Sequence, residues 1–120
     1  MAMTREQIRE KWNEMTPRER DAWVAEVVQP PVLSVLCFYV LPHYTTDISA
    51  AGLVLAKIPG EVYIYRKTTG GFVVSFGYST DDCPECGEDS FEVQAQGIET
   101  TLSEAICLAA LIAKLSESSV

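Results

Sequence analysis

Apolar residues recur with a helical period at the start of the chain. They predict two helices, over about residues 5–14 and 17–28, and each range follows a threonine that is placed to cap it. Proline at the first position of the second range supports that start, and Gln29-Pro30-Pro31 ends the helix because proline cannot continue it. The expected capping pairs are Thr4 with Gln7 and Thr16 with Glu19.

Two further helices are predicted later in the chain. Residues 47–58 carry apolar side chains at spacings of three and four, and Thr46 or Asp47 caps them. Residues 102–116, capped by Thr100 or Thr101, are apolar over most of the helical surface. A helix of that kind must lie at the centre of the core or in a contact between subunits.

Strands are predicted where apolar and polar residues alternate with a period of two. Residues 61–66 and 72–76 alternate on either side of a turn with two glycines, so they form a hairpin. Residues 91–96 supply a third strand. The apolar run over residues 32–42 is rich in β-branched and aromatic residues, which favours a buried strand over an extended connector.

These elements predict an α+β fold, a short antiparallel β-meander sandwiched between α-helices in α-β-α layers. The chain has 120 residues, which predicts a single domain over residues 1–120 with one core. We find no internal repeat and no linker that divides it.

Charge narrows the range of partners. The formal net charge of −8 argues against a nucleic acid polymer, because phosphate contacts need a basic surface. The net charge does not exclude a small anion as a ligand, because a few well-placed arginines suffice to hold it. The charged start is no signal peptide, and the longest apolar run, over residues 30–42, is too short to span a membrane. We therefore expect a cytoplasmic protein with reduced cysteines.

The sequence gives little support for a catalytic role. His43 is the one histidine, so a serine or cysteine nucleophile has a single imidazole to serve as its base. The sequence contains no GxSxG, HExxH, P-loop or GxGxxG motif. We expect a protein that is not an enzyme, with His43 as a surface or cap residue.

The motif Cys83-Pro-Glu-Cys86 has the spacing of a zinc knuckle. It offers only half of the four ligands that structural zinc needs, so two chains would have to share one ion. A redox dithiol and a plain acidic loop are the other interpretations. We expect no cofactor, with zinc at Cys83 and Cys86 as the alternative.

Aromatic residues alternate along the predicted hairpin, which places them on two faces. One set packs on a helix, and the other faces water, a second subunit or a flat ligand. The residues are Tyr63, Tyr65, Phe72, Phe76 and Tyr78.

Three segments together resemble the phage ABA sandwich domain family. Residues 18–25 match its opening pattern RExDxxVA, and residues 42–51 look like its signature P-x-Y-S/T-T-D-I-x-A-A. Residues 99–111 are similar to its closing helix, T-x-P-x-A-I-C-R-A-A-L. The matches occur in the right order and cover about a quarter of the chain. In the closing helix, Leu108 stands where many relatives have arginine, which implies an altered pocket or a different ligand.

The resemblance implies a small α-β-α protein of a phage or prophage. Some phage proteins of this size and build are anti-defence sponges, which sequester a cyclic nucleotide immune signal, such as the cyclised ADP-ribose of Thoeris defence, without cleaving it. It thus implies a self-associating, non-enzymatic protein of the host bacterial cytosol that binds a small anionic nucleotide. The alternatives are a phage accessory protein that binds a host protein and a structural module bridged by zinc through Cys83 and Cys86.

The same resemblance suggests a binding site. Arg18 is the first expected anion contact and Arg66, on the hairpin, is the second. Tyr44, Thr46 and Asp47 lie at a helix N-terminus, where backbone N–H groups favour anions. The alternative interpretation is structural, with Thr46 and Asp47 as caps and Tyr44 packed in the core.

Overall fold

The computed structural model describes residues 3–28, 42–80 and 90–115. Most of the strand expected over residues 32–42 lies outside these ranges, as do Cys83 and Cys86. The elements, in chain order, are α1 (Arg5–Glu14), α2 (Pro17–Val27), α3 (Ile48–Lys57), β1 (Glu61–Arg66), β2 (Phe72–Thr80), β3 (Ser90–Glu99) and α4 (Leu102–Leu115).

The helices begin at the predicted caps. Thr4 and Gln7 bond reciprocally through side chain and backbone, and Thr16 and Glu19 do the same. Each pair satisfies backbone N–H groups that the first turn leaves without helical partners. Asp47 caps α3 by accepting a hydrogen bond from the backbone N–H two residues later. Local chemistry therefore determines where these three helices start.

The three strands form an antiparallel meander in the order β1-β2-β3. The turn between β1 and β2 closes through Lys67, whose N–H donates to the carbonyl of Gly71 and whose carbonyl accepts from Gly70 N. Both glycines have positive φ, 102° and 90°, which other residues rarely adopt. β2 and β3 both extend further than predicted, because each continues for as long as the other supplies backbone partners.

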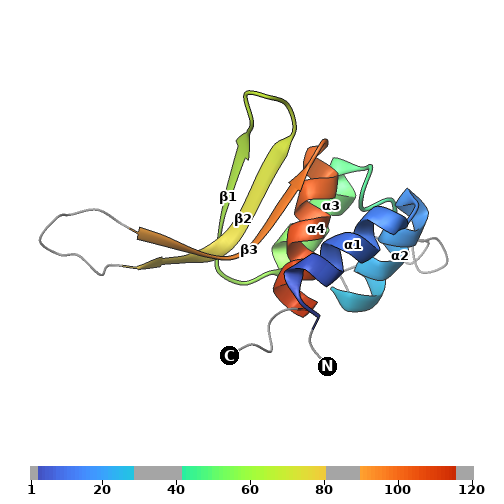
Figure 1. The fold of residues 1–120 in the computed structure, drawn as a ribbon, viewed down its shortest axis with the longest axis horizontal. Helices are drawn as coiled ribbons and strands as arrows, with labels where there is room; N and C mark the ends of the chain where they lie inside the picture. Colours follow the sequence, from blue (N-terminus) through green and yellow to red (C-terminus); the bar gives the residue numbers. More distant parts are fainter. Residues whose placement is uncertain (1–2, 29–41, 81–89, 116–120) are drawn as a thin grey trace, which may run out of the picture.

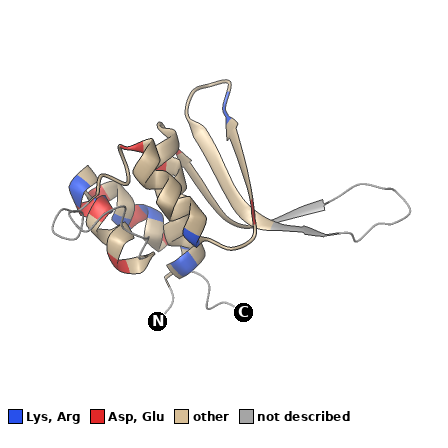
Figure 2. Cartoon of the chain, turned by 180° about the vertical axis from the view of Figure 1, so that it is seen from behind, with Lys and Arg blue, Asp and Glu red and all other residues tan. Residues whose placement is uncertain are grey.

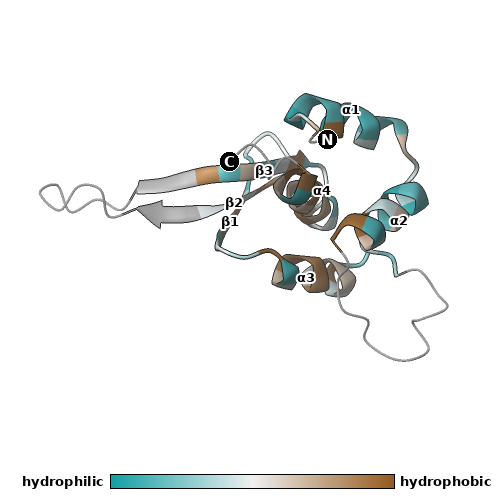
Figure 3. Cartoon of the chain, turned by 90° about the horizontal axis from the view of Figure 1, so that it is seen from below, coloured by the Kyte–Doolittle hydropathy of each residue, from teal (hydrophilic) through white to brown (hydrophobic). Residues whose placement is uncertain are grey.

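Helix α4 is the centre of the molecule. It packs on β3 and β2 with one side, and the main contacts of α1, α2 and α3 are with α4 rather than with the sheet (Figures 1 and 3). Its buried residues, from Ser103 to Ile112, explain why it is apolar almost all round. The last helix was expected either in the core or in a contact between subunits, and its apolar residues lie in the core.

The α+β class and the antiparallel meander are confirmed. The order of layers differs from the expected sandwich, because the described helices all lie on one side of the sheet (Figure 1). The physical reason is the apolar surface of α4, which needs cover on two sides. The sheet covers one side and the other helices cover the second, so within the described residues one face of the sheet has no helix on it.

Candidate functional site

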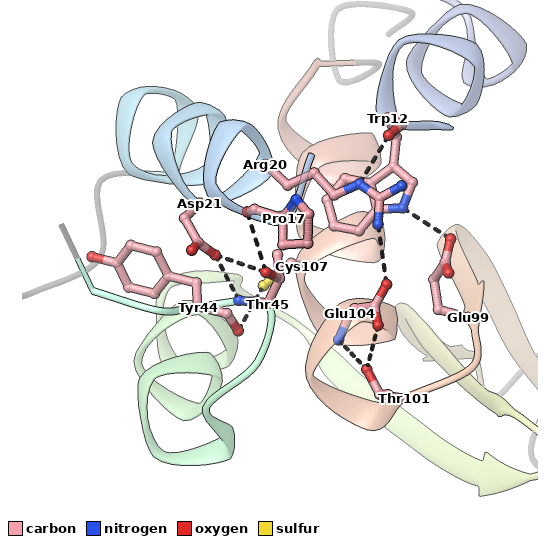
Figure 4. A network of polar contacts seen from close by, with 10 residues as sticks. All are labelled: Trp12, Pro17, Arg20, Asp21, Tyr44, Thr45, Glu99, Thr101, Glu104 and Cys107. Atoms are coloured by element: carbon pink, nitrogen blue, oxygen red, sulfur yellow. Dashed lines mark hydrogen bonds and ion pairs between the residues drawn. The ribbon is translucent and has the colours of Figure 1, made fainter. Parts of the chain in front are cut away.

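A buried carboxylate joins α2 to the segment that precedes α3. Asp21 is 0% exposed and accepts two hydrogen bonds from Thr45, 2.9 Å from its N–H and 2.8 Å from its hydroxyl (Figure 4). The guanidinium of Arg18 lies 2.8 Å from the other carboxylate oxygen. The charge of Asp21 is therefore both paired and hydrogen-bonded, which is what a buried carboxylate requires.

Cys107 of helix α4 contacts the same segment before α3. Its thiol donates to the backbone carbonyl of Tyr44 at 3.3 Å, and the ring of Tyr44 is only 2% exposed. Burial raises the pKa of Cys107 far above its ordinary value, and the negative charges of Asp21 and Glu104 raise it further. The thiol thus stays protonated and serves packing, because only a thiolate is an effective nucleophile.

We call this cluster the junction: Arg18, Asp21, Tyr44, Thr45 and Cys107. Its members come from all three segments that carry the resemblance: two from α2, two from the segment before α3 and one from α4. Sequence reasoning did not single out Asp21 or Thr45. The available signal was an acidic residue on the otherwise apolar side of the helix over residues 17–28. The geometry indicates that the motif residues hold the fold together here.

A second polar cluster ties α1 to α2, to α4 and to the end of β3. Arg20 donates to the backbone carbonyl of Trp12 at 2.9 Å and pairs with Glu104 at 3.1 Å, and its guanidinium lies 4.6 Å from the centre of the Trp12 ring. The indole N–H of Trp12 donates to Glu99 at 2.9 Å (Figure 4). Burial raises the pKa of Glu99, and the bond from Trp12 opposes part of that rise.

The sheet surface that faces away from α4, here called the outer face, carries exposed aromatic and apolar groups. Tyr63 is 50% exposed, Tyr65 54% and Ile98 45%. The amide of Gln96 on β3 donates to the hydroxyl of Ser75 on the central strand β2 at 3.0 Å, so a polar pair joins these two strands. From the strand register, the outer face includes Glu61, Tyr63 and Tyr65 of β1, the buried Val73 and Ser75 of β2, and Gln96 and Ile98 of β3.

The predicted alternation of aromatics is confirmed where it is described. Phe72 and Phe76 pack with the core on the α4 side, and Tyr63 and Tyr65 point to the opposite side. Nearby positive charge sits at the end of the hairpin, where Arg66 ends β1 and Lys67 begins the turn. Most other charged residues that the structure describes belong to the helices (Figure 2). By the strand register Arg66 belongs to the α4 side, so the outer face carries Glu61 at one end of β1, Lys67 beyond the other end, and uncharged residues between them.

A cavity of about 50 Å³ lies between the ends of α3 and α4 and the strands. That volume holds about one water molecule and is far below the roughly 300 Å³ or more of typical ligand pockets. The cavity is lined by Ile58, Pro59, Phe76, Gly77, Gln94, Ala113 and Lys114. It offers no room for a nucleotide.

In comparisons with known proteins, no family model matches the chain, and no curated protein matches it. A solved structure does. The chain is similar to a phage protein from Bacillus cereus ATCC 14579, with a TM-score of 0.55 and 17% sequence identity. The match covers 81% of this chain and 85% of that one. At this identity the likeness shows a shared fold.

The structure brings four of the five expected ligand contacts to one region. Arg18, Tyr44, Thr46 and Asp47 lie at or beside the junction, whereas Arg66 lies on the sheet, across α4 from α2 (Figure 1). Tyr44 is buried in the core, and the carboxylate of Asp47 already caps α3. These placements favour the structural interpretation of Tyr44 and Asp47. Contact of any of the five with a ligand stays a prediction.

The remaining expectations concern metal, catalysis and membrane. Among the described residues no cluster of three or more His, Cys, Asp or Glu side chains can hold a metal ion, and Cys83 and Cys86 fall outside them. The exposed His43 lies in the turn before α3, where its carbonyl accepts from the N–H groups of Thr46 and Asp47. Within the same residues no helix has both the length and the hydrophobicity to cross a bilayer.

Proposed function

We propose that this chain is a phage-encoded, non-enzymatic binding protein that sequesters a small nucleotide signal on the outer face of its sheet. Two lines support a phage origin: the resemblance of three segments to the phage ABA sandwich domain, and the fold shared with the Bacillus cereus phage protein. The binding role rests on the resemblance and on the chemistry of the sheet surface. The observation that carries the location of the site is the exposure of Tyr63 and Tyr65, two residues apart on the same face of β1.

The chemistry of this surface suits a nucleotide. A base that stacks on an exposed aromatic ring gains about 1–3 kcal/mol, and two neighbouring rings on a rigid strand are already in position. Lys67 follows directly along the chain, where its charge attracts phosphate oxygens, whereas the strand register places Arg66 on the side of α4. Sequestration needs tight binding and no bond cleavage, so the site requires neither a base nor a nucleophile.

The region around the junction suits an anion less well. The guanidinium of Arg18 already neutralises the buried carboxylate of Asp21, and an incoming phosphate would have to compete with that carboxylate. The carboxylate of Asp47 occupies the N-terminus of α3 and repels a second anion. Of the five expected contacts, Arg66 alone belongs to the sheet, and it lies on the opposite face of β1 from Tyr63 and Tyr65.

The test is a titration calorimetry and thermal-shift survey of the purified chain with cyclic and linear nucleotides, including a cyclic ADP-ribose isomer. We expect one class to bind, to raise the melting temperature and to be recovered intact after heating. The double variant Tyr63→Ala/Tyr65→Ala should weaken binding by about tenfold or more, since each lost ring removes about 1–3 kcal/mol.

Ile48→Ala is the matched control, because Ile48 is an exposed apolar residue on α3 rather than on the sheet. It should leave the affinity unchanged. If no nucleotide binds, the proposed function is wrong. If a nucleotide binds equally well to the double variant, the function stands and the site lies elsewhere.

A further inference from the structure

Strand β1 is apolar and exposed on both of its faces. All six of its residues are exposed, including Tyr63 and Tyr65 on the outer face and Val62 and Ile64 on the side of α4. Ile64 keeps 43% of its surface because α4 packs on β2 and β3 and does not cover β1. Edge strands are usually protected by charges, prolines or bulges. The residues between Glu61 and Arg66 include none of these.

The open edge of β1 also has a defined set of hydrogen-bonding groups. The N–H of Lys67 donates to Gly71 O across the turn, and bonds to β2 alternate from there along an antiparallel ladder. Odd-numbered residues of β1 thus bond to β2. The N–H and C=O groups of Val62, Ile64 and Arg66 point away from β2, toward the edge.

We propose that β1 pairs with β1 of a second copy of this chain, antiparallel and about a twofold axis at Ile64, and so joins two three-stranded sheets into one. In this register Ile64 lies opposite the partner's Ile64, and Val62 lies opposite the partner's Arg66. Every outward-pointing backbone group of the strand then finds a partner. The twofold axis closes the assembly at two subunits.

The charges of the strand favour the same register. Glu61 precedes the apolar residues and Lys67 follows them, so the antiparallel arrangement places Glu61 opposite the partner's Lys67 on each side of the axis. A strand with opposite charges at its two ends is complementary to itself, which favours a second copy over an unrelated partner. If the axis lies at Tyr63 instead, Glu61 faces the partner's Tyr65 and the charge pairing is lost.

Pairing extends the outer face across the axis. Tyr63 lies opposite the partner's Tyr65, so four tyrosines gather at the centre of the joined sheet. The inference goes beyond the proposed function, because it rests on backbone groups and charges and requires no nucleotide. An experiment can contradict the proposed dimer without contradicting the proposed function, because subunit number and ligand binding are different measurements.

The experiment measures the mass of the full-length chain by sedimentation velocity and native mass spectrometry over about 1–100 μM. We expect a dimer at the upper concentrations. Ile64→Lys places two ammonium groups directly opposite each other and should weaken the dimer by at least tenfold. The matched control is Ile98→Lys, which introduces the same charge at an equally exposed apolar position on the other edge strand and should leave the dimer intact.

Charge exchange tests the register itself. Glu61→Lys should weaken the dimer, and the double variant Glu61→Lys/Lys67→Glu should restore it. Hydrogen exchange supplies a measurement that needs no variant: the amides of Val62, Ile64 and Arg66 should become more protected as the protein concentration rises. A wild-type monomer at 100 μM, an open-ended assembly, or a dimer that Ile98→Lys disrupts and Ile64→Lys does not would overturn the proposal.

Discussion

At the scale of single residues, Asp21 is held by contacts on both of its carboxylate oxygens. Its carboxylate is buried and accepts from Thr45, 24 residues along the chain. Asp21→Ala leaves the buried N–H of Thr45 without its acceptor, leaves its hydroxyl only the carbonyl of Pro17 at 3.4 Å, and removes the partner of Arg18, so we expect it to lower the free energy of unfolding by about 3 kcal/mol. Urea denaturation measures the loss. Asp47→Ala, which removes an exposed helix cap, should cost only about 1 kcal/mol. Equal losses would mean that the junction does not hold the fold.

Glu99 should make stability depend on pH. Burial raises its pKa above the ordinary 4.5, so the folded state keeps the proton to higher pH than the unfolded state does. The contribution of Glu99 is therefore fully present below pH 4.5 and declines as the pH rises through the raised pKa. Glu99→Gln lacks this decline, so its unfolding free energy relative to wild type should increase between about pH 4 and pH 8.

Glu19 should show the opposite dependence of stability on pH and so serves as the control. Hydrogen bonds from the backbone N–H and the side chain of Thr16 lower the pKa of Glu19. Its contribution is present above the ordinary value of 4.5 and is lost as the pH falls through the lowered pKa. Glu19→Gln should thus be less stable than wild type at neutral pH, and the deficit should shrink in acid. If both variants show the same trend with pH, the assigned causes are wrong.

At the scale of elements, the contact between β3 and α4 depends on Gly97. A Cβ at this position would lie 2.6 Å from the backbone nitrogen of Ala109 and would also collide with the carbonyl of Ala105. Both are helix backbone atoms that cannot move alone, so Gly97→Ala must push α4 away from the sheet. We expect a loss of about 3 kcal/mol or more in chemical denaturation.

Gly52 in α3 is the comparison for that substitution. A Cβ there meets no atom within 4 Å. Gly52→Ala should therefore raise the unfolding free energy by about 0.5–1 kcal/mol, because alanine favours the helix. A destabilising Gly52→Ala would show that α3 packs against something that the described residues do not include.

The elements themselves were largely predictable, because their signals are local. Capping pairs such as Thr16 with Glu19 act within one turn, and the two glycines after Lys67 determine the hairpin. The ends of β2 and β3 were not predictable in the same way. Ser90 and Glu99 carry no strand signal of their own, and they belong to β3 because β2 lies beside them.

At the scale of the whole molecule, patterns of hydrophobicity predicted the α+β class but not the order of its layers. The apolar surface of α4 requires cover on two sides, and nothing in the pattern states whether a sheet, a helix or a second chain supplies it. The site shows the same limit. Arg18 was expected near the segment before α3, and it donates to the carbonyl of Pro42 there. The buried role of Asp21 was not predictable, because it depends on Thr45, which comes close only in the folded chain.

The position of α4 between the sheet and the other helices has a consequence for how such a protein changes over generations. The outer face and the junction lie on opposite sides of that helix, so an exchange at Tyr63 or Ile98 leaves the packing around Asp21 as it is. Substitutions in the hairpin can therefore change the outer face without disturbing the junction. Among descendants of a common ancestor, we expect α2, the start of α3 and α4 to stay recognisable while β1 drifts.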